Sequence, residues 1–322
     1  MPSSNRASRR TKADRGEVEE LLTRVNATRD RLVKVPAILK RFCQAVLAAA
    51  CSGRLTGDWR KGRDLINGAG SLLERISSTE SEPNVADEET SIELPGIPEN
   101  WAWYHCEQLC DPKRSITYGV IKLGPPVNDG IPTLRSSDVR WLYIDDTDIK
   151  RISPKIAANY SRTFLKGSEV LVTVRGTLGG VAVVPPTMAG FNISREVAML
   201  PVLSQLKSAF IAYAIASPWC QNWLSEVTIG VAYSGVNIRD LKCLPLPMPP
   251  VEEQEEIVRR VNTLLSLADK IESRLKMATV RNDQLTEAVF TKAFHGELVT
   301  TEANSPATKT GPTSLRPNYS LV

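Results

Sequence analysis

Residues 45–55 read Ala-Val-Leu-Ala-Ala-Ala-Cys-Ser-Gly-Arg-Leu, and residues 288–298 read Ala-Val-Phe-Thr-Lys-Ala-Phe-His-Gly-Glu-Leu. The two stretches are the clearest part of an internal repeat, in which residues 18–56 align without a gap with residues 261–299. Self-similarity at a fixed offset is typical of a structural unit that occurs more than once in a chain. The sequence therefore predicts two copies of one element, separated by a different structure.

Both copies space their apolar residues by three and four positions in turn. A narrow apolar stripe with a mean period of about 3.5 residues is typical of a coiled-coil helix. In the first copy the stripe contains Val18, Leu21, Val25, Leu32, Val35, Leu39, Phe42 and Val46. In the second copy it contains Val261, Leu264, Ala268, Ile271, Leu275, Ala278, Leu285 and Val289, with the polar Asn282 among them. We therefore predict two long spacer helices.

An amphipathic helix packed on a globular core is the alternative interpretation of each copy, although the many charged residues on the other faces disfavour it. Pro36 should kink the first helix, because proline lacks the N–H that an internal hydrogen bond needs. Gly53 and Gly296 should end the two helices as C-cap glycines. The second helix is predicted to provide a subunit interface, formed by Val261, Leu264, Ile271, Leu275, Leu285 and Val289.

Composition divides the chain into six segments. They are a basic disordered tail (residues 1–16), the first spacer helix (17–56), a helix or turn with a flexible acidic linker (57–93), a globular domain (94–250), the second spacer helix (251–299) and a disordered tail (300–322). In the globular segment, short β-type runs alternate with turn signals, and one helix is predicted near residues 204–225. This pattern predicts an α+β domain flanked by two long coiled-coil helices.

Charge and composition exclude several classes of protein. The formal net charge is +4, and the first 60 residues hold most of the basic excess, where they could contact phosphates. A membrane span needs about 20 continuous apolar residues, and a secretory signal needs an apolar run near the N-terminus. Since the sequence has neither, we expect a cytoplasmic protein. Its six cysteines are predicted to be buried thiols, because Cys106 and Cys110 lack the second close pair of a zinc site.

Sequence motifs of catalytic sites are missing as well. The stretch at residues 176–180 is glycine-rich but lacks the following helix of a phosphate-binding loop. The acidic-Pro-Pro-aromatic tetrapeptide of DNA methyltransferases is absent, and two histidines in unrelated segments give acid–base catalysis little to work with. We expect the carboxylates at residues 145–148 to form a solvated turn and not a metal site. The sequence therefore favours a binding function over an enzyme.

Five stretches occur in the order and spacing of a known family. They are residues 44–60, 94–101 (LPGIPENW), 131–139 (IPTLRSSDV), 171–179 (LVTVRGTLG) and 237–254. With them, the chain resembles the specificity subunit of type I restriction–modification systems over about residues 17–299. A full family member carries two recognition domains and two spacer helices. This chain has both helices and one such domain, and so it resembles a half-subunit, natural or truncated.

The resemblance implies that residues 94–250 are a target-recognition domain that reads one half of a split site in double-stranded DNA. It also implies that the helices bind methyltransferase subunits and set the distance between the half-sites. S-adenosylmethionine, ATP and Mg would then belong to partner subunits, with no cofactor in this chain. A restriction subunit, and a second specificity half or a second copy of this chain, are further partners that the resemblance allows.

Basic and amide side chains on turns are the candidates for DNA contact. Arg pairs with guanine and Asn or Gln with adenine, whereas many other contacts position the protein on phosphates. The predicted DNA-contacting residues are Lys113, Arg114, Lys122, Arg135, Arg175, Asn192, Arg195 and Asn237. Lys113, Arg114 and Lys122 are the ones expected on phosphates.

Two other classes of function stay open on the sequence alone. The chain could be an autonomous DNA-binding regulator that dimerises through its coiled coil, or a scaffold whose domain binds protein. The helices could close on each other within one chain, or two chains could pair and read a palindromic bipartite site.

Overall fold

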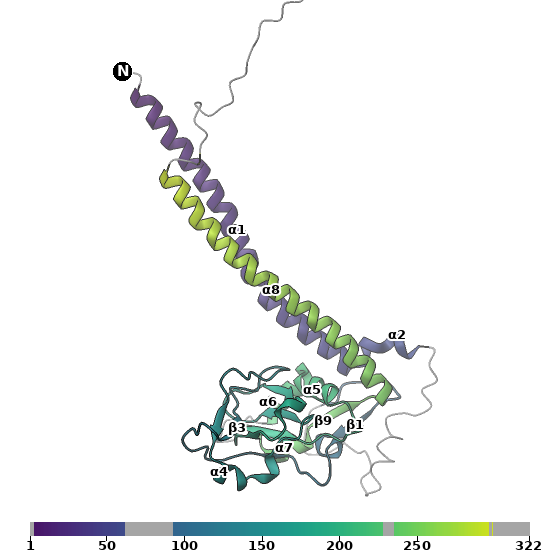
Figure 1. Ribbon diagram of the computed structural model, residues 1–322. Coiled ribbons are helices and arrows are strands. Elements are labelled where there is room, and N and C mark those ends of the chain that lie inside the picture. The colour runs from purple at the N-terminus through teal and green to yellow at the C-terminus, as the bar shows by residue number, and fades with distance from the viewer. Residues whose placement is uncertain (1–2, 62–92, 228–234, 296–297, 299–322) are drawn as a thin grey trace, which may run out of the picture. The chain divides into compact units, whose positions relative to one another are not determined.

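A computed structural model describes residues 3–61, 93–227, 235–295 and 298 (Figure 1). The chain forms two compact units. One combines residues 1–38 with residues 270–322, and the other comprises residues 39–269. Two long helices, α1 (Ser3–Cys51) and α8 (Val251–His295), each contribute to both units.

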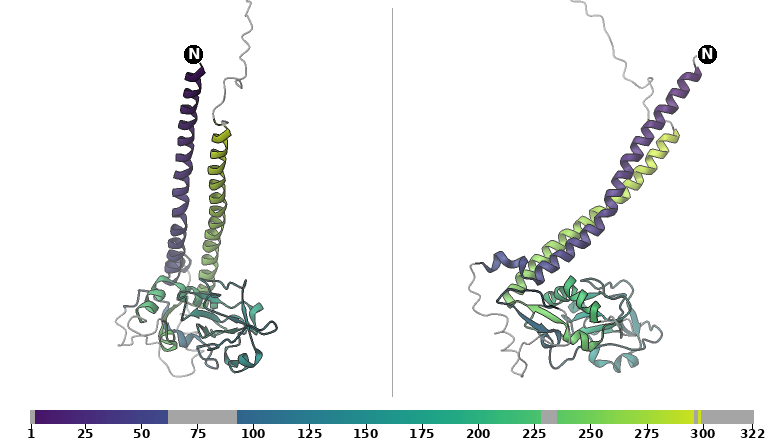
Figure 2. Two further views of the ribbon diagram at one scale, coloured as in Figure 1. Left: turned by 90° about the vertical axis from the view of Figure 1, so that its left-hand side faces the viewer. Right: turned by 180° about the vertical axis from the view of Figure 1, so that it is seen from behind.

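In the first unit, α1 and α8 run antiparallel, with the start of α1 and the end of α8 at the same end (Figures 1 and 2). Burial along α8 follows the predicted heptad, because Leu275 is half-buried while Asn282 and Val289 are buried. Along α1, the predicted stripe residues from Val18 to Val35 are each half-buried, among mostly exposed neighbours. The predicted spacing therefore describes the apolar face of this antiparallel pair.

Two of the predicted interface residues lie at the edge of that face. Ile271 is 37% exposed and Leu285 is 56% exposed, so the partner helix within this pair does not bury them, and their predicted role in a subunit interface stays a prediction. A single partner helix covers only one side of an apolar face, and residues on its flank stay in contact with water. The second unit covers other members of the predicted set, since Val261 is buried and Leu264 half-buried against its core.

The first helix begins earlier than predicted. The structure places residues 3–16 in α1, where we expected a disordered basic tail. Residues 3–16 contain Ala, Arg and Lys, which are good helix formers, and extending an existing helix requires no new nucleation. Pro36 lies within α1, which continues on both sides of it. Residues 62–92 of the predicted linker segment (57–93), the predicted C-terminal tail (300–322) and Gly296 lie outside the described residues.

The second unit contains three small sheets. In the first, β1 (Ala102–His105) pairs antiparallel with β9 (Pro245–Met248). The second has the order β2 (Thr117–Tyr118), β8 (Val197–Leu200), β5 (Val170–Thr173) and β6 (Val181–Val183), all antiparallel. The third has the order β4 (Lys150–Ile152), β3 (Ile131–Leu134) and β7 (Asn192–Ile193), with β3 and β7 parallel. This arrangement of sheets with helices confirms the predicted α+β class.

Short helices connect and cover these strands. They are η1 (Arg54–Thr56), α2 (Gly57–Arg60), η2 (Cys106–Leu109), α4 (Pro154–Ala158), η3 (Ser161–Thr163), η4 (Pro186–Met188), α5 (Ser208–Ala216), α6 (Pro218–Val227) and α7 (Ile238–Cys243). The single helix predicted near residues 204–225 is therefore two helices. Pro218 explains the break, because a proline disfavours helical backbone at the residue before it, and Ser217 is extended.

The end of α1 belongs to the core of the second unit. Val46, Leu47 and Ala50 are buried in one cluster with α5 and with Ile257 and Val261 of α8. At these ends the helices pack on a globular core, which is the alternative that the sequence left open. Gly53 closes α1 with φ +71°, as a C-cap glycine should, and a Cβ there would lie 2.4 Å from the Pro98 ring. None of the helices in the described residues is long and apolar enough to cross a membrane.

Candidate functional site

Loops at one end of the four-stranded sheet meet around Arg175. We define this loop cluster as Tyr118, Ser136, Arg175, Arg195, Glu196 and Gly235. The backbone N–H groups of Val174 and Arg175 both donate to the Glu196 carbonyl, at 2.9 and 3.3 Å. Arg175 also forms an isolated antiparallel bridge with Gly235. The end of β5 therefore lies between the turn before β8 and the segment that leads to α7.

The side chains of the loop cluster are held by specific contacts. The Arg175 guanidinium lies over the Tyr118 ring, 5.5 Å from its centroid, within the range of a cation–π interaction. The Ser136 hydroxyl donates to Glu196 Oε2 at 3.1 Å. Gly176 has φ +73°, and a Cβ at this position would lie 2.9 Å from Ser136 Oγ. A glycine after Arg175 therefore lets the Ser136 turn approach.

Several predicted DNA-contacting residues lie in or beside the loop cluster. Arg175 is half-buried and Arg195 exposed, and both belong to it. Asn237 is exposed two residues after Gly235, where it forms the N-cap of α7. Lys122 is exposed two residues beyond Val120, whose carbonyl accepts from the Arg195 N–H at 2.9 Å. Lys113 is exposed on a separate turn.

Asn192 was predicted to read DNA, and the structure contradicts this prediction. Its side chain is fully buried in β7. There its Oδ1 accepts from Thr163 Oγ1 at 2.6 Å and from the Ile193 N–H at 2.8 Å, and its Nδ2 donates to the Tyr160 carbonyl at 3.3 Å. A buried amide whose hydrogen bonds are made inside the domain cannot reach a base edge.

Arg114 and Arg135 also have partners inside the domain. Arg114 pairs with the buried Glu169 at 2.8 Å, which favours a structural role over the predicted phosphate contact. Arg135 pairs with Asp138 at 3.0 Å and donates to the Asp148 carbonyl at 2.5 Å. The hydrogen bonds that Arg135 donates to the Asp138 carboxylate raise the pKa of Arg135 above its usual value. Its guanidinium therefore fixes the turn that carries Ser136.

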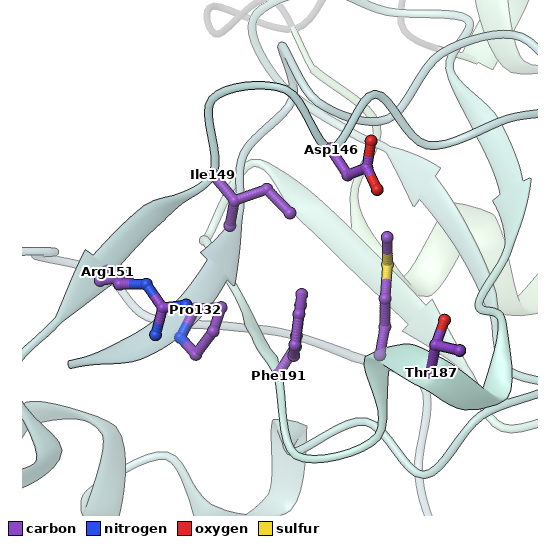
Figure 3. Close-up of a pocket in the computed structure, with 7 residues that line it drawn as sticks. Pro132, Asp146, Ile149, Arg151, Thr187 and Phe191 are labelled. Carbon is purple, nitrogen blue, oxygen red and sulfur yellow. The ribbon is translucent and has the colours of Figure 1, made fainter. Parts of the chain in front are cut away.

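The domain also has a cavity of about 360 Å³, shown in Figure 3. It is lined by Pro132, Asp146, Ile149, Arg151, Thr187, Met188 and Phe191. None of these is a predicted DNA-contacting residue. In the parts of the chain that the structure describes, no three His, Cys, Asp or Glu residues gather as a metal site would require.

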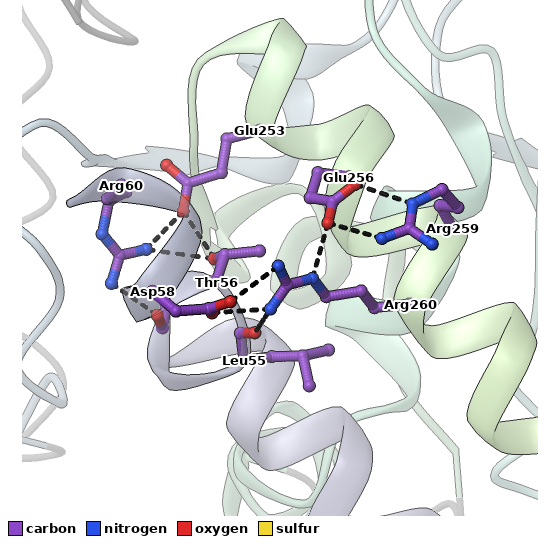
Figure 4. A network of polar contacts seen from close by, with 9 residues as sticks. Leu55, Thr56, Asp58, Arg60, Glu253, Glu256, Arg259 and Arg260 are labelled. Atoms are coloured by element: carbon purple, nitrogen blue, oxygen red, sulfur yellow. Dashed lines mark hydrogen bonds and ion pairs between the residues drawn. The ribbon is translucent and has the colours of Figure 1, made fainter. Parts of the chain in front are cut away.

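A second polar site joins the end of α1 to the start of α8. We define this junction network as Thr56, Arg60, Trp101 and Glu253. The Glu253 carboxylate is fully buried, forms an ion pair with Arg60, and accepts from Thr56 Oγ1 at 2.6 Å and from Trp101 Nε1 at 2.9 Å. Figure 4 shows the contacts of Glu253 with Arg60 and Thr56 beside a second set around Arg260. The sequence places Glu253 near the positive end of a helix but does not reveal these partners.

Arg260 links α8 to the turn after α1. Its guanidinium pairs with Asp58 and Glu256, each at 2.6 Å, and donates to the Leu55 carbonyl at 2.7 Å. A hydrogen bond from Arg260 lowers the pKa of Asp58 to about 2, and one from Arg259, with a second from Arg260, lowers the pKa of Glu256 to about 2. Both carboxylates therefore stay charged in mild acid, and their contribution to stability is lost only as the pH falls from about 4 toward 2.

Three residues of the loop cluster were missed by the sequence analysis. They are Tyr118, Ser136 and Glu196. Ser136 stands inside the family-like stretch at residues 131–139, and Glu196 directly follows Arg195, so adjacency to a predicted residue was the available signal. Tyr118 lies 57 positions from Arg175 in the chain, and only the fold brings the two together.

The chain is similar to known proteins of one family. The family model described as "Type I restriction modification DNA specificity domain" matches residues 118–278, which is half of the chain. The chain is 34% identical over 287 residues to the type I restriction enzyme EcoBI specificity subunit of Escherichia coli, with 88% of this chain and 55% of that subunit covered. It is 30% identical over 287 residues to the EcoDI specificity subunit of Escherichia coli, covering 88% and 59%. The chain thus spans somewhat more than half the length of these curated relatives.

The fold is similar to that of a solved structure described as the structural basis underlying complex assembly and conformational transition of the type I R-M system. The TM-score is 0.50 at 18% sequence identity, with 87% of this chain and 60% of that chain covered. At this identity the likeness concerns the fold alone. The family match includes the whole loop cluster and the first part of α8. This chain belongs to the family of type I restriction–modification specificity subunits.

Proposed function

We propose that this chain recognises a specific DNA sequence within a type I restriction–modification complex and directs partner methyltransferase subunits to it. The observation that carries the proposal is the loop cluster, which presents Arg175 and the exposed Arg195 from loops inside the family-matched segment. Loops held by a rigid sheet are where binding residues concentrate. The chain itself recognises DNA and catalyses no reaction. The partner subunits bind S-adenosylmethionine, ATP and Mg.

The helical unit supports a partner-binding role. Ile271 and Leu285 are large apolar residues on one flank of α8, and water reaches both. Large exposed apolar residues on a helix are a typical docking surface for another helix. We place the methyltransferase subunit on this flank, with a restriction subunit and a second specificity half as further partners of the complex.

A methylation map tests the proposed function. The chain is expressed with its partner methyltransferase subunit in a host without DNA methylation, and N6-methyladenine is mapped over the genome. A new split motif is the expected result, and a palindromic motif would indicate two copies of this chain in the complex. Expression of both folded subunits without any new methylated motif would contradict the proposal. The family relationship does not favour an autonomous regulator or a protein scaffold.

Arg175→Ala should weaken specific DNA binding by roughly 5- to 150-fold, which corresponds to one bidentate base contact. Folding should be retained, because the guanidinium contacts an aromatic ring and no buried carboxylate in the described residues. Arg162→Ala is the matched control, since Arg162 is an exposed arginine outside the loop cluster. Titrations of both variants on specific and unrelated duplexes at fixed salt give the result. Equal affinities for Arg175→Ala and Arg162→Ala would remove Arg175 from the reading surface.

Leu285→Glu should weaken binding of the methyltransferase subunit by at least about 10-fold, because it places a charge in an apolar contact. The helix should remain folded, since Leu285 is 56% exposed. Val280→Glu is a close control, because Val280 is also 56% exposed and lies about 140° around the helix from Leu285. Co-purification and calorimetry measure the binding. Equal losses in both variants would contradict a docking surface on the Leu285 flank.

A further inference from the structure

We infer that Glu196 reads a base, and that Arg175 and Glu196 together read one G·C pair of the target site. This inference rests on the proposed function and extends it, because it assigns a base pair to the loop cluster. Arg pairs with O6 and N7 of guanine, whereas Glu accepts a hydrogen bond from the exocyclic amino group of cytosine. The two side chains are thus complementary to the two halves of one base pair.

The backbone brings the two residues together. Both Val174 and Arg175 donate to the Glu196 carbonyl, so two residues of β5 and its extension oppose one residue on the neighbouring strand. This is the hydrogen-bond pattern of a β-bulge, and bulges occur beside functional sites, where they redirect a side chain. Arg175 and Glu196 therefore leave adjacent backbones at the same end of the sheet.

The carboxylate is held in place from the other side by Ser136. The Ser136 hydroxyl donates to Glu196 Oε2 at 3.1 Å and lies against Gly176, the residue that follows Arg175. Oε1 of Glu196 accepts no hydrogen bond from the described residues and can accept one from a base. The Arg135–Asp138 ion pair holds the turn that carries Ser136. A carboxylate oriented by such contacts needs little rearrangement to accept from a base, which favours specific recognition.

Charge gives an independent reason for a base contact. A carboxylate that faces DNA is repelled by phosphates, so its place on a reading surface is favourable only where it meets an amino group. In the described residues, Arg175 lies over the Tyr118 ring, Glu196 accepts from a hydroxyl, and no ion pair joins the two side chains. Both charged groups therefore keep hydrogen-bonding capacity for a base pair.

The test compares methylation motifs of variants, each expressed as the full chain with its methyltransferase subunit. The wild type is expected to give a motif with an invariant G·C pair. Glu196→Gln should reduce the preference at that one pair by roughly 5- to 150-fold and admit adenine, because Gln pairs with adenine. Ser136→Ala keeps the carboxylate and should weaken the preference at the same pair to a smaller extent. Glu99→Gln, at an exposed glutamate outside the loop cluster, should leave the motif unchanged.

The outcomes separate this inference from the proposed function. Absence of any motif in the wild type overturns both. A wild-type motif that Glu196→Gln leaves unchanged, or that loses preference equally at all positions, overturns the base contact alone. Thermal unfolding of each variant establishes that it is folded. If Glu196→Gln does not fold, the motif of Ser136→Ala tests the base contact instead. An unchanged motif in that variant overturns the inference.

Discussion

Glu253→Ala is expected to lower the free energy of unfolding by about 3–5 kcal/mol, the usual cost of removing one partner of a buried ion pair. The carboxylate is fully buried and accepts hydrogen bonds from Thr56 and Trp101 as well as from Arg60. Without it, the Trp101 N–H and the Arg60 guanidinium lose their charged acceptor. Glu253→Gln keeps the shape but turns an NH2 group toward these donors, and should cost about 1–3 kcal/mol. Urea unfolding followed by circular dichroism measures both.

Glu252→Gln is the matched control for this prediction. Glu252 is exposed in the same first turn of α8, so it shares the helix-dipole interaction but none of the junction network. Its replacement should change stability by about 0.5 kcal/mol at most. A double-mutant cycle of Glu253→Gln with Arg60→Gln should show a coupling of about 0.5–3 kcal/mol. Equal stability of Glu253→Ala and Glu252→Gln would disprove the role of the junction network.

Those parts of the fold that depend on local patterns could be predicted from the sequence. Helical period and turn chemistry act over a few residues, and they correctly gave the apolar stripe of α1 and the C-cap at Gly53. The strands β5, β6 and β8 are short apolar runs of the kind that the sequence predicts for the globular segment. The break before α6 has a local signal as well, because Pro218 stands at the first position of α6.

One segment with a strand-like composition, residues 141–144, forms a turn. Residues 141–144 look like a strand by composition, yet the structure has a turn there, closed by a bridge between Val139 and Ile144. Leu142 adopts φ +64° at its tip, a conformation that is uncommon for a residue with a side chain. The N–H of Leu142 donates to the Val181 carbonyl at 2.7 Å, and this distant contact holds the turn.

The candidate site could be predicted only in part, because a residue's type does not reveal its partner. Arg175 and Arg114 are equivalent as basic residues on turns. Arg175 lies over the Tyr118 ring in the loop cluster, whereas Arg114 forms an ion pair with Glu169, 55 positions away in the chain. Likewise, the Arg60 partner Glu253 is 193 positions away. Pairings over such separations are set by the folded chain and leave no periodic trace in the sequence.

Arg114→Ala should destabilise the recognition domain by about 3–5 kcal/mol, and not merely weaken its binding to DNA. The Arg114 guanidinium donates to Glu169 Oε1 at 2.8 Å and to the Phe164 carbonyl at 3.2 Å. Glu169 is 2% exposed, and its second oxygen has no hydrogen-bond partner among the described residues. Removing Arg114 therefore leaves a buried charge whose one remaining hydrogen bond, within the described parts of the chain, is from the Lys166 N–H at 2.8 Å. Thermal and urea unfolding measure the loss.

Arg114→Lys and Lys113→Ala separate the structural role from the phosphate contact that the sequence suggested. Lysine keeps the charge but lacks the fork that bridges Glu169 and Phe164, so Arg114→Lys should still be less stable than the wild type. Lys113→Ala removes an exposed neighbouring charge and should change stability by about 0.5 kcal/mol at most. A phosphate contact at Arg114 would instead leave stability intact and reduce the dependence of log K on log salt by about 1. A stable Arg114→Ala variant with a smaller salt dependence would thus restore Arg114 to the DNA-binding surface.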